Sequence, residues 1–261
     1  MWEHHAKTIQ NLVSELHEDK RYLALIIGGS IAKGREREDS DVDIILVVTD
    51  EEFQRRELIK DFHYCRNDVC TYPNGYIDGT VVNLRFLYEV AERGNEPTRA
   101  AYVGAFVAYS HVPDLEKLIQ KIPIYLEHEQ KEKIESFYAH LEASRWFVPE
   151  AEKRNDKYLL GWAINELILY GGRMILAHNK ILYPYHKWFL TELQNAKNKP
   201  DNFLDLINNL LNEPNHKNSE KFCNAILEYT EWDKPTEGWV SRFREESEWH
   251  WLKGHAPLKD R

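Results

Sequence analysis

The chain has little cysteine and no long apolar segment. Its 261 residues include 3 cysteines, Cys65, Cys70 and Cys223, and an odd number without zinc-type spacing predicts reduced thiols rather than a disulfide framework. No apolar run approaches the roughly 20 residues of a membrane-spanning helix, and the first residues, MWEHHAKTIQ, lack the apolar core of a signal peptide. We therefore expect a cytoplasmic protein without membrane segments.

Basic residues are also fewer than acidic ones. Lys and Arg number 34 against 43 Asp and Glu, which gives a formal net charge of -9. A negative surface field repels a nucleic-acid backbone and attracts cationic small molecules. The charge balance therefore disfavours a nucleic-acid partner, although solubility alone would also account for it.

The main candidate residues for ligand and metal binding lie between Ile26 and Val48, in the stretch IIGGSIAKGREREDSDVDIILVV. Gly28 and Gly29 lack a Cβ, so the chain can turn sharply and bring its amides close to a ligand, and Ser30 adds a hydroxyl. Such a turn at the start of a helix is suited to bind an anion such as phosphate.

Two aspartates follow at the start of the next apolar strand. Side chains alternate along a strand, so Asp41 and Asp43 point from the same face. Adjacent carboxylates repel one another unless a cation lies between them, and Mg²⁺ takes such oxygen ligands together with substrate phosphates. A phosphate-binding turn beside a carboxylate pair indicates phosphoryl or nucleotidyl transfer.

The order Gly-Gly-Ser, three residues, Gly34, five residues, Ser-Asp-Val-Asp between two apolar strands resembles the signature of the DNA polymerase beta-like nucleotidyltransferase superfamily. That superfamily includes aminoglycoside and lincosamide nucleotidyltransferases and the minimal nucleotidyltransferases of toxin and antitoxin systems. The resemblance implies Mg²⁺ held by Asp41 and Asp43 and a nucleoside triphosphate, with ATP favoured, as donor. It further implies nucleotide-binding roles for Gly28, Gly29, Ser30, Lys33, Ser40 and Arg85, with Arg35 as another possible cation.

The superfamily usually places a third acidic residue on a neighbouring strand. A strand predicted over 76–87 contains VVNLRFL, whose alternation puts Asn83 and Arg85 on the polar face. Asn83 then takes the third metal-ligand position, where an amide oxygen offers no charge and weakens metal binding. Two alternatives remain open: Asp78 from a bent strand, or a glutamate from the second half of the chain.

The first half alternates helix and strand signals, whereas the second half reads as helices only. We predict helices over 3–19, 51–63 and 114–121, and strands over 22–27, 41–48, 68–72, 76–87 and 105–110. Beyond Pro123 we predict helices over 125–147, 150–179, 185–196, 201–211, 219–232 and 237–251, separated by prolines that include Pro149. The predicted fold is α+β: a nucleotidyltransferase domain over 1–122 with a small mixed sheet, and a helical bundle over 123–261.

Two features of the helical half invite functional hypotheses. Glu166 is bordered by apolar residues, and a desolvated carboxylate is suited to act as a general base toward an acceptor hydroxyl. Arg173 and His178 form an R-x4-H string that resembles the motif of HEPN-domain ribonucleases. Five residues along a helix correspond to about 140° of rotation, so the two side chains do not share a face.

The sequence therefore predicts transfer of a nucleoside monophosphate to a hydroxyl of a small molecule, with release of pyrophosphate. The family resemblance makes an aminoglycoside-like antibiotic, and hence antibiotic resistance, the leading expectation. Two alternatives stay open: a regulatory nucleotide-binding protein of the same fold with weak or no activity, and a HEPN-type ribonuclease. The acceptor, the donor base and the choice between monomer and homodimer are not determined by the sequence.

Overall fold

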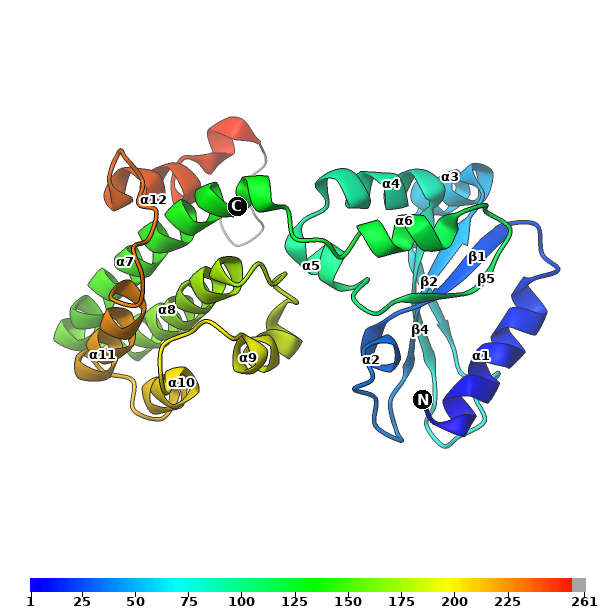
Figure 1. Cartoon of the computed structure of the whole chain (residues 1–261), viewed down its shortest axis with the longest axis horizontal. Helices are drawn as coiled ribbons and strands as arrows, with labels where there is room; N and C mark the ends of the chain where they lie inside the picture. Colours follow the sequence, from blue (N-terminus) through cyan, green and yellow to red (C-terminus); the bar gives the residue numbers. More distant parts are fainter. Residues whose placement is uncertain (255–261) are drawn as a thin grey trace. The chain divides into compact units, whose positions relative to one another are not determined.

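The computed structural model describes residues 1–254 and divides the chain into two compact units, Met1–Ile124 and Tyr125–Arg261 (Figure 1). The division falls close to the boundary predicted after residue 122. The first unit combines a mixed sheet with helices and the second is helical, as predicted.

The sheet of the first unit has five strands in the order β3-β4-β2-β1-β5. The strands are β1 (Tyr22–Ile27), β2 (Val42–Val48), β3 (His63–Arg66), β4 (Ile77–Asn83) and β5 (Phe106–Ser110). β2 and β4 pair in parallel, whereas the other neighbours pair antiparallel. The central strands β1 and β2 consist almost entirely of buried aliphatic residues, because both faces of the sheet are covered.

Helices cover the two faces of this sheet (Figure 1). The first unit contains α1 (Glu3–Leu16), α2 (Gly29–Ala32), α3 (Asp50–Ile59), α4 (Leu84–Arg93), α5 (Glu96–Ala100) and α6 (Leu115–Lys121). Ile9, Leu12 and Leu16 of α1 recur at helical spacing and join the core on one face of the sheet. α4 and α6 contribute Leu87 and Leu115 to the core on the other face. The resulting layers fix the strand register that positions the site.

Two predicted strands were wrong. The strand predicted over 68–72 lies in a loop, and β3 precedes it at His63–Arg66. The strand predicted to run to residue 87 ends at Asn83, where α4 begins. The Asn83 side chain accepts a hydrogen bond from the Phe86 amide at 3.0 Å, and such a cap ends the strand and starts the helix.

The second unit consists of η1 (Glu127–Glu129), α7 (Gln130–Arg154), α8 (Lys157–His178), α9 (His186–Asn195), α10 (Phe203–Asn212), α11 (His216–Leu227), α12 (Trp239–Ser247) and η2 (His250–Lys253). Pro149 lies inside α7 and does not separate two helices as predicted. The break comes at Asn155, which adopts a left-handed conformation, followed by Asp156, whose side chain caps α8. No helix within residues 1–254 is long and apolar enough to cross a membrane.

Candidate active site

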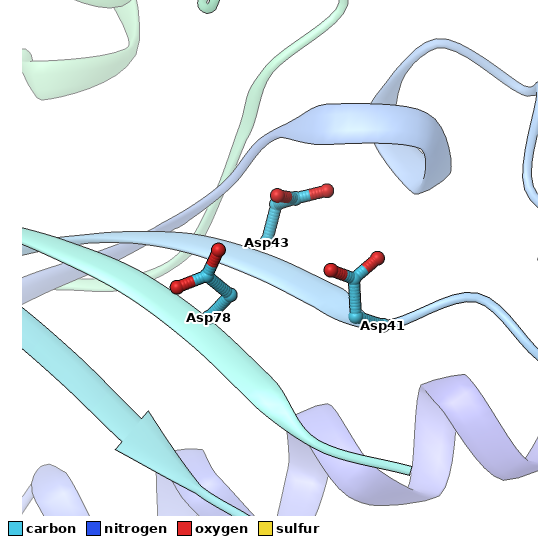
Figure 2. A group of neighbouring side chains, drawn as sticks. All are labelled: Asp41, Asp43 and Asp78. Atoms are coloured by element: carbon cyan, nitrogen blue, oxygen red, sulfur yellow. The ribbon is translucent and has the colours of Figure 1, made fainter. Parts of the chain in front are cut away.

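Three carboxylates from two strands converge in the first unit. Asp41 directly precedes β2, Asp43 lies within it and Asp78 lies on β4. In the parallel pairing of these strands Asp43 is the register partner of Asp78, so their side chains leave the same face of the sheet. Each aspartate offers a carboxylate oxygen, and these oxygens all lie within 4.8 Å of one another (Figure 2).

The structure does not bring Asn83 to the predicted third ligand position. Asp78 instead lies with Asp41 and Asp43, which was one of the two alternatives left open. Asn83 lies five residues further along β4, opposite Val48, and this separation amounts to roughly 17 Å along the strand and an inversion of face. Its amide instead donates to Asp50 at 2.9 Å and its oxygen caps α4. No amide therefore substitutes for a carboxylate in this group.

The glycine turn lies directly against Asp43. The Gly28 amide donates to the Asp43 carbonyl at 3.0 Å, which ties the end of β1 to the start of β2. Gly29 has a φ of 59°, and a Cβ at this position would lie 1.7 Å from Oδ2 of Asp43. Only glycine allows this approach. The turn, Ser30 and the carboxylates therefore belong to one local structure, as the sequence predicts.

Two further side chains lie beside the outer carboxylates. The Asp41 carboxylate raises the pKa of the Tyr76 hydroxyl above its ordinary value. The imidazole Nε2 of His63 lies 2.7 Å from Oδ1 of Asp78. Because an ionised carboxylate only accepts, the ring nitrogen is the donor in this contact. The sequence did not predict either residue, since their positions depend on strand pairing and on a loop conformation.

The donor set fits a hard divalent cation. Three carboxylate oxygens are the ligand type that Mg²⁺ and Mn²⁺ prefer. Like charges about 5 Å apart repel by about 1–3 kcal/mol per pair at the dielectric constants of a protein surface. Such a group is stabilised when a cation binds. Asp41, Asp43 and Asp78 are the residues that would hold it.

Other predicted nucleotide-binding residues have different surroundings. Lys33 ends α2, next to the glycine turn. The Ser40 hydroxyl accepts from the Arg37 amide at 2.9 Å and so closes the loop before Asp41. Arg85 lies on α4, two residues beyond Asn83, with its side chain 83% exposed and 3.9 Å from Glu89. The structure therefore does not bring Arg85 to the three carboxylates.

Glu166 lies in the helical unit. Its carboxylate is half-buried, and together with burial it raises the pKa of the neighbouring Tyr170 hydroxyl. It borders a cavity of about 220 Å³ whose other lining residues are mainly apolar, with Asn165 and His186 as the polar ones. This setting is compatible with ligand binding at Glu166. The role of general base stays a prediction.

Arg173 and His178 of the R-x4-H string have different neighbours. The Arg173 guanidinium lies over the rings of Phe137 and Tyr183, at 4.3 and 4.5 Å from their centroids. His178 packs edge-on against Tyr229 and Trp232. The rotation of about 140° between positions five residues apart accounts for this separation. The two side chains thus do not assemble one site on this helix.

The three carboxylates lie within the part of the chain that a family model matches. A model described as "Nucleotidyltransferase domain" matches residues 7–97, a range that includes all three aspartates and the glycine turn. No curated protein matches the chain. Among solved structures the chain is similar to a nucleotidyltransferase-like protein from Exiguobacterium sibiricum, with 10% identity and a TM-score of 0.49. That alignment covers 98% of this chain and 80% of the other.

Proposed function

We propose that this chain, whose residues 7–97 match the nucleotidyltransferase domain, transfers a nucleoside monophosphate from a nucleoside triphosphate to a hydroxyl group of a small molecule. ATP is the proposed donor and pyrophosphate the second product. The observation that carries the proposal is the group of three carboxylates, Asp41, Asp43 and Asp78, beside a glycine turn.

The proposed reaction is an in-line displacement at the α-phosphorus. The acceptor oxygen bonds to this phosphorus while the bond to the oxygen that bridges to the β-phosphate breaks. The hydroxyl proton passes to a base, and the electron pair leaves with pyrophosphate. Magnesium, when bound to the three aspartates, would supply charge neutralisation and orientation of the phosphates.

The chain's own residues have distinct proposed roles in this reaction. Asp41, Asp43 and Asp78 hold the metal in a fixed place on the sheet. The glycine turn at Gly29, with Ser30, binds the triphosphate through backbone amides and a hydroxyl. Glu166 is the proposed base that accepts the proton of the acceptor hydroxyl.

The acceptor is proposed to be a small cationic molecule. The formal net charge of -9 favours a cation over a nucleic acid. An aminoglycoside-like polyamine remains a candidate on charge alone, and nothing in the comparisons singles out antibiotics. The regulatory alternative loses its main support, because it depended on Asn83 replacing the third carboxylate. The ribonuclease alternative loses support because Arg173 and His178 have separate neighbours.

Pyrophosphate release tests the proposal. Purified protein is incubated with Mg²⁺ and ATP, GTP, CTP or UTP, and with a panel of aminoglycosides, lincosamides and simpler amino alcohols. The proposal expects release that requires one acceptor and is lost in Asp43→Asn. Mass spectrometry of the acceptor should show the mass of the added nucleoside monophosphate. Absence of release with every pair, from protein that binds nucleotide, would contradict it.

A further inference from the structure

The loop between β3 and β4 contacts the residues on both sides of Asp41. The Tyr72 hydroxyl donates to the Ser40 carbonyl at 2.7 Å. The Val42 amide donates to the Tyr76 carbonyl at 3.1 Å. One short loop thus fixes the backbone on both sides of Asp41.

The same hairpin also contacts the third carboxylate. His63 is the first residue of β3, the edge strand that pairs antiparallel with β4. Its Nε2 lies 2.7 Å from Oδ1 of Asp78, although the two side chains are 66% and 48% exposed. A directed hydrogen bond between exposed groups restricts a carboxylate that packing alone would leave free to rotate.

We infer that His63 is a positioning residue that orients Asp78 for metal binding and thereby sets the metal affinity of the site. The inference rests on the metal site of the proposed function. Figure 2 shows the three carboxylates facing one another across β2 and β4. His63 restrains Asp78 from the edge strand through one carboxylate oxygen, Oδ1.

The expected size of the effect follows from the behaviour of ligand-supporting hydrogen bonds. Removing such a partner typically costs 10–100-fold in metal affinity, because the ligand must then be oriented at the expense of its rotational freedom. This support is partly exposed, so we expect the lower end, about tenfold.

Mn²⁺ alone is the probe, and its binding is read from the loss of the free-ion signal in electron paramagnetic resonance. The variants are His63→Ala and His63→Gln, in which the glutamine amide can donate from near the Nε2 position. Tyr88→Phe is the surface control. Tyr88 is exposed on α4, and its hydroxyl makes no hydrogen bond among residues 1–254. Thermal unfolding of each variant reports whether the fold is retained.

We expect His63→Ala to weaken Mn²⁺ binding about tenfold while the unfolding midpoint stays at the wild-type value. His63→Gln should recover most of the affinity, and Tyr88→Phe should match the wild type. Unchanged affinity in His63→Ala would overturn the inference. Tighter binding would also overturn it, because it would mean that this contact competes with the metal. So would wild-type protein that shows no Mn²⁺ binding dependent on Asp43.

This experiment separates the inference from the proposed function. Mn²⁺ binding requires neither nucleotide nor acceptor. Weakened binding in His63→Ala, together with a complete absence of pyrophosphate release by the wild type, would refute the transferase and leave the positioning role established. Pyrophosphate release together with wild-type Mn²⁺ affinity in His63→Ala would do the reverse.

Discussion

Replacing Gly29 by alanine tests the contact on which the site depends. The new Cβ would lie 1.7 Å from Oδ2, 2.2 Å from Cγ and 2.5 Å from Cβ of Asp43. Ordinary non-bonded contacts lie near 3.5 Å, so the carboxylate must move by roughly 2 Å. Since Asp43 is the central residue of the carboxylate group, this displacement removes a metal ligand from its place.

Two costs add up in this variant. An alanine in the left-handed region, at a φ of 59°, costs about 1–2 kcal/mol of stability. The collision with Asp43 adds about 1–3 kcal/mol, as overpacking usually does. A misplacement of about 1 Å in a catalytic group can reduce turnover on the order of 10²-fold. We therefore expect at least that loss in pyrophosphate release, and a clear loss of Mn²⁺ affinity.

Gly34 provides the control. It has a φ of 62°, and a Cβ there would meet nothing within 4 Å. Gly34→Ala should carry the conformational cost of about 1–2 kcal/mol without the collision. Urea unfolding, Mn²⁺ titration and pyrophosphate release are measured on both variants. Equal Mn²⁺ affinity and equal turnover in Gly29→Ala and Gly34→Ala would refute the argument that the turn constrains Asp43.

Three further predictions concern the third carboxylate, acid stability and the base. Asp78→Asn should reduce turnover on the order of 10²-fold. Asn83→Ala should leave turnover unchanged and lower the free energy of unfolding by about 1 kcal/mol through the lost cap. The opposite pattern would mean that Asn83, and not Asp78, is the third ligand. Hydrogen bonds from Arg55 and Arg56 lower the pKa of buried Glu52 to about 2. Because the folded pKa of Glu52 lies below the unfolded one, this stabilisation is complete above pH ~4.5 and fades as the pH falls toward 2. Glu52→Gln should therefore lower the free energy of unfolding by about 2 kcal/mol at pH 7 and by progressively less in acid, as measured by urea unfolding. Glu166→Gln should lower kcat on the order of 10²-fold without changing Mn²⁺ affinity, and an unchanged kcat would exclude Glu166 as the base.

Local patterns predicted the central part of the site well. The paired glycines and the aliphatic run after Asp43 each form a short local pattern, so their geometry follows from the lack of a Cβ and from strand alternation. The predicted strands over 22–27 and 41–48 nearly coincide with β1 and β2. The fold class followed from the change in pattern between the two halves of the chain.

The third carboxylate was misassigned because it depends on pairing between distant segments. Alternation within VVNLRFL cannot say which residue of β4 lies opposite Asp43, and the register was set by the parallel pairing of β2 with β4. The cap at Asn83 was also missed. Asparagine is a strong N-cap residue, and this property should have raised the possibility that a helix begins at Leu84. Pro149 shows the converse, since packing of α7 along α8 tolerates a residue that usually ends a helix.

The charge of the site links metal and nucleotide binding. Asp41, Asp43 and Asp78 are acidic side chains within 4.8 Å of one another, and a nucleoside triphosphate brings several more negative charges. Without a cation the two would repel each other by several kcal/mol in a setting of intermediate dielectric constant. An exposed restraint such as His63 does not remove this charge, because a hydrogen bond orients a carboxylate without neutralising it. Under the proposed function the nucleotide would therefore enter together with its metal, and the contact that orients Asp78 would affect donor binding.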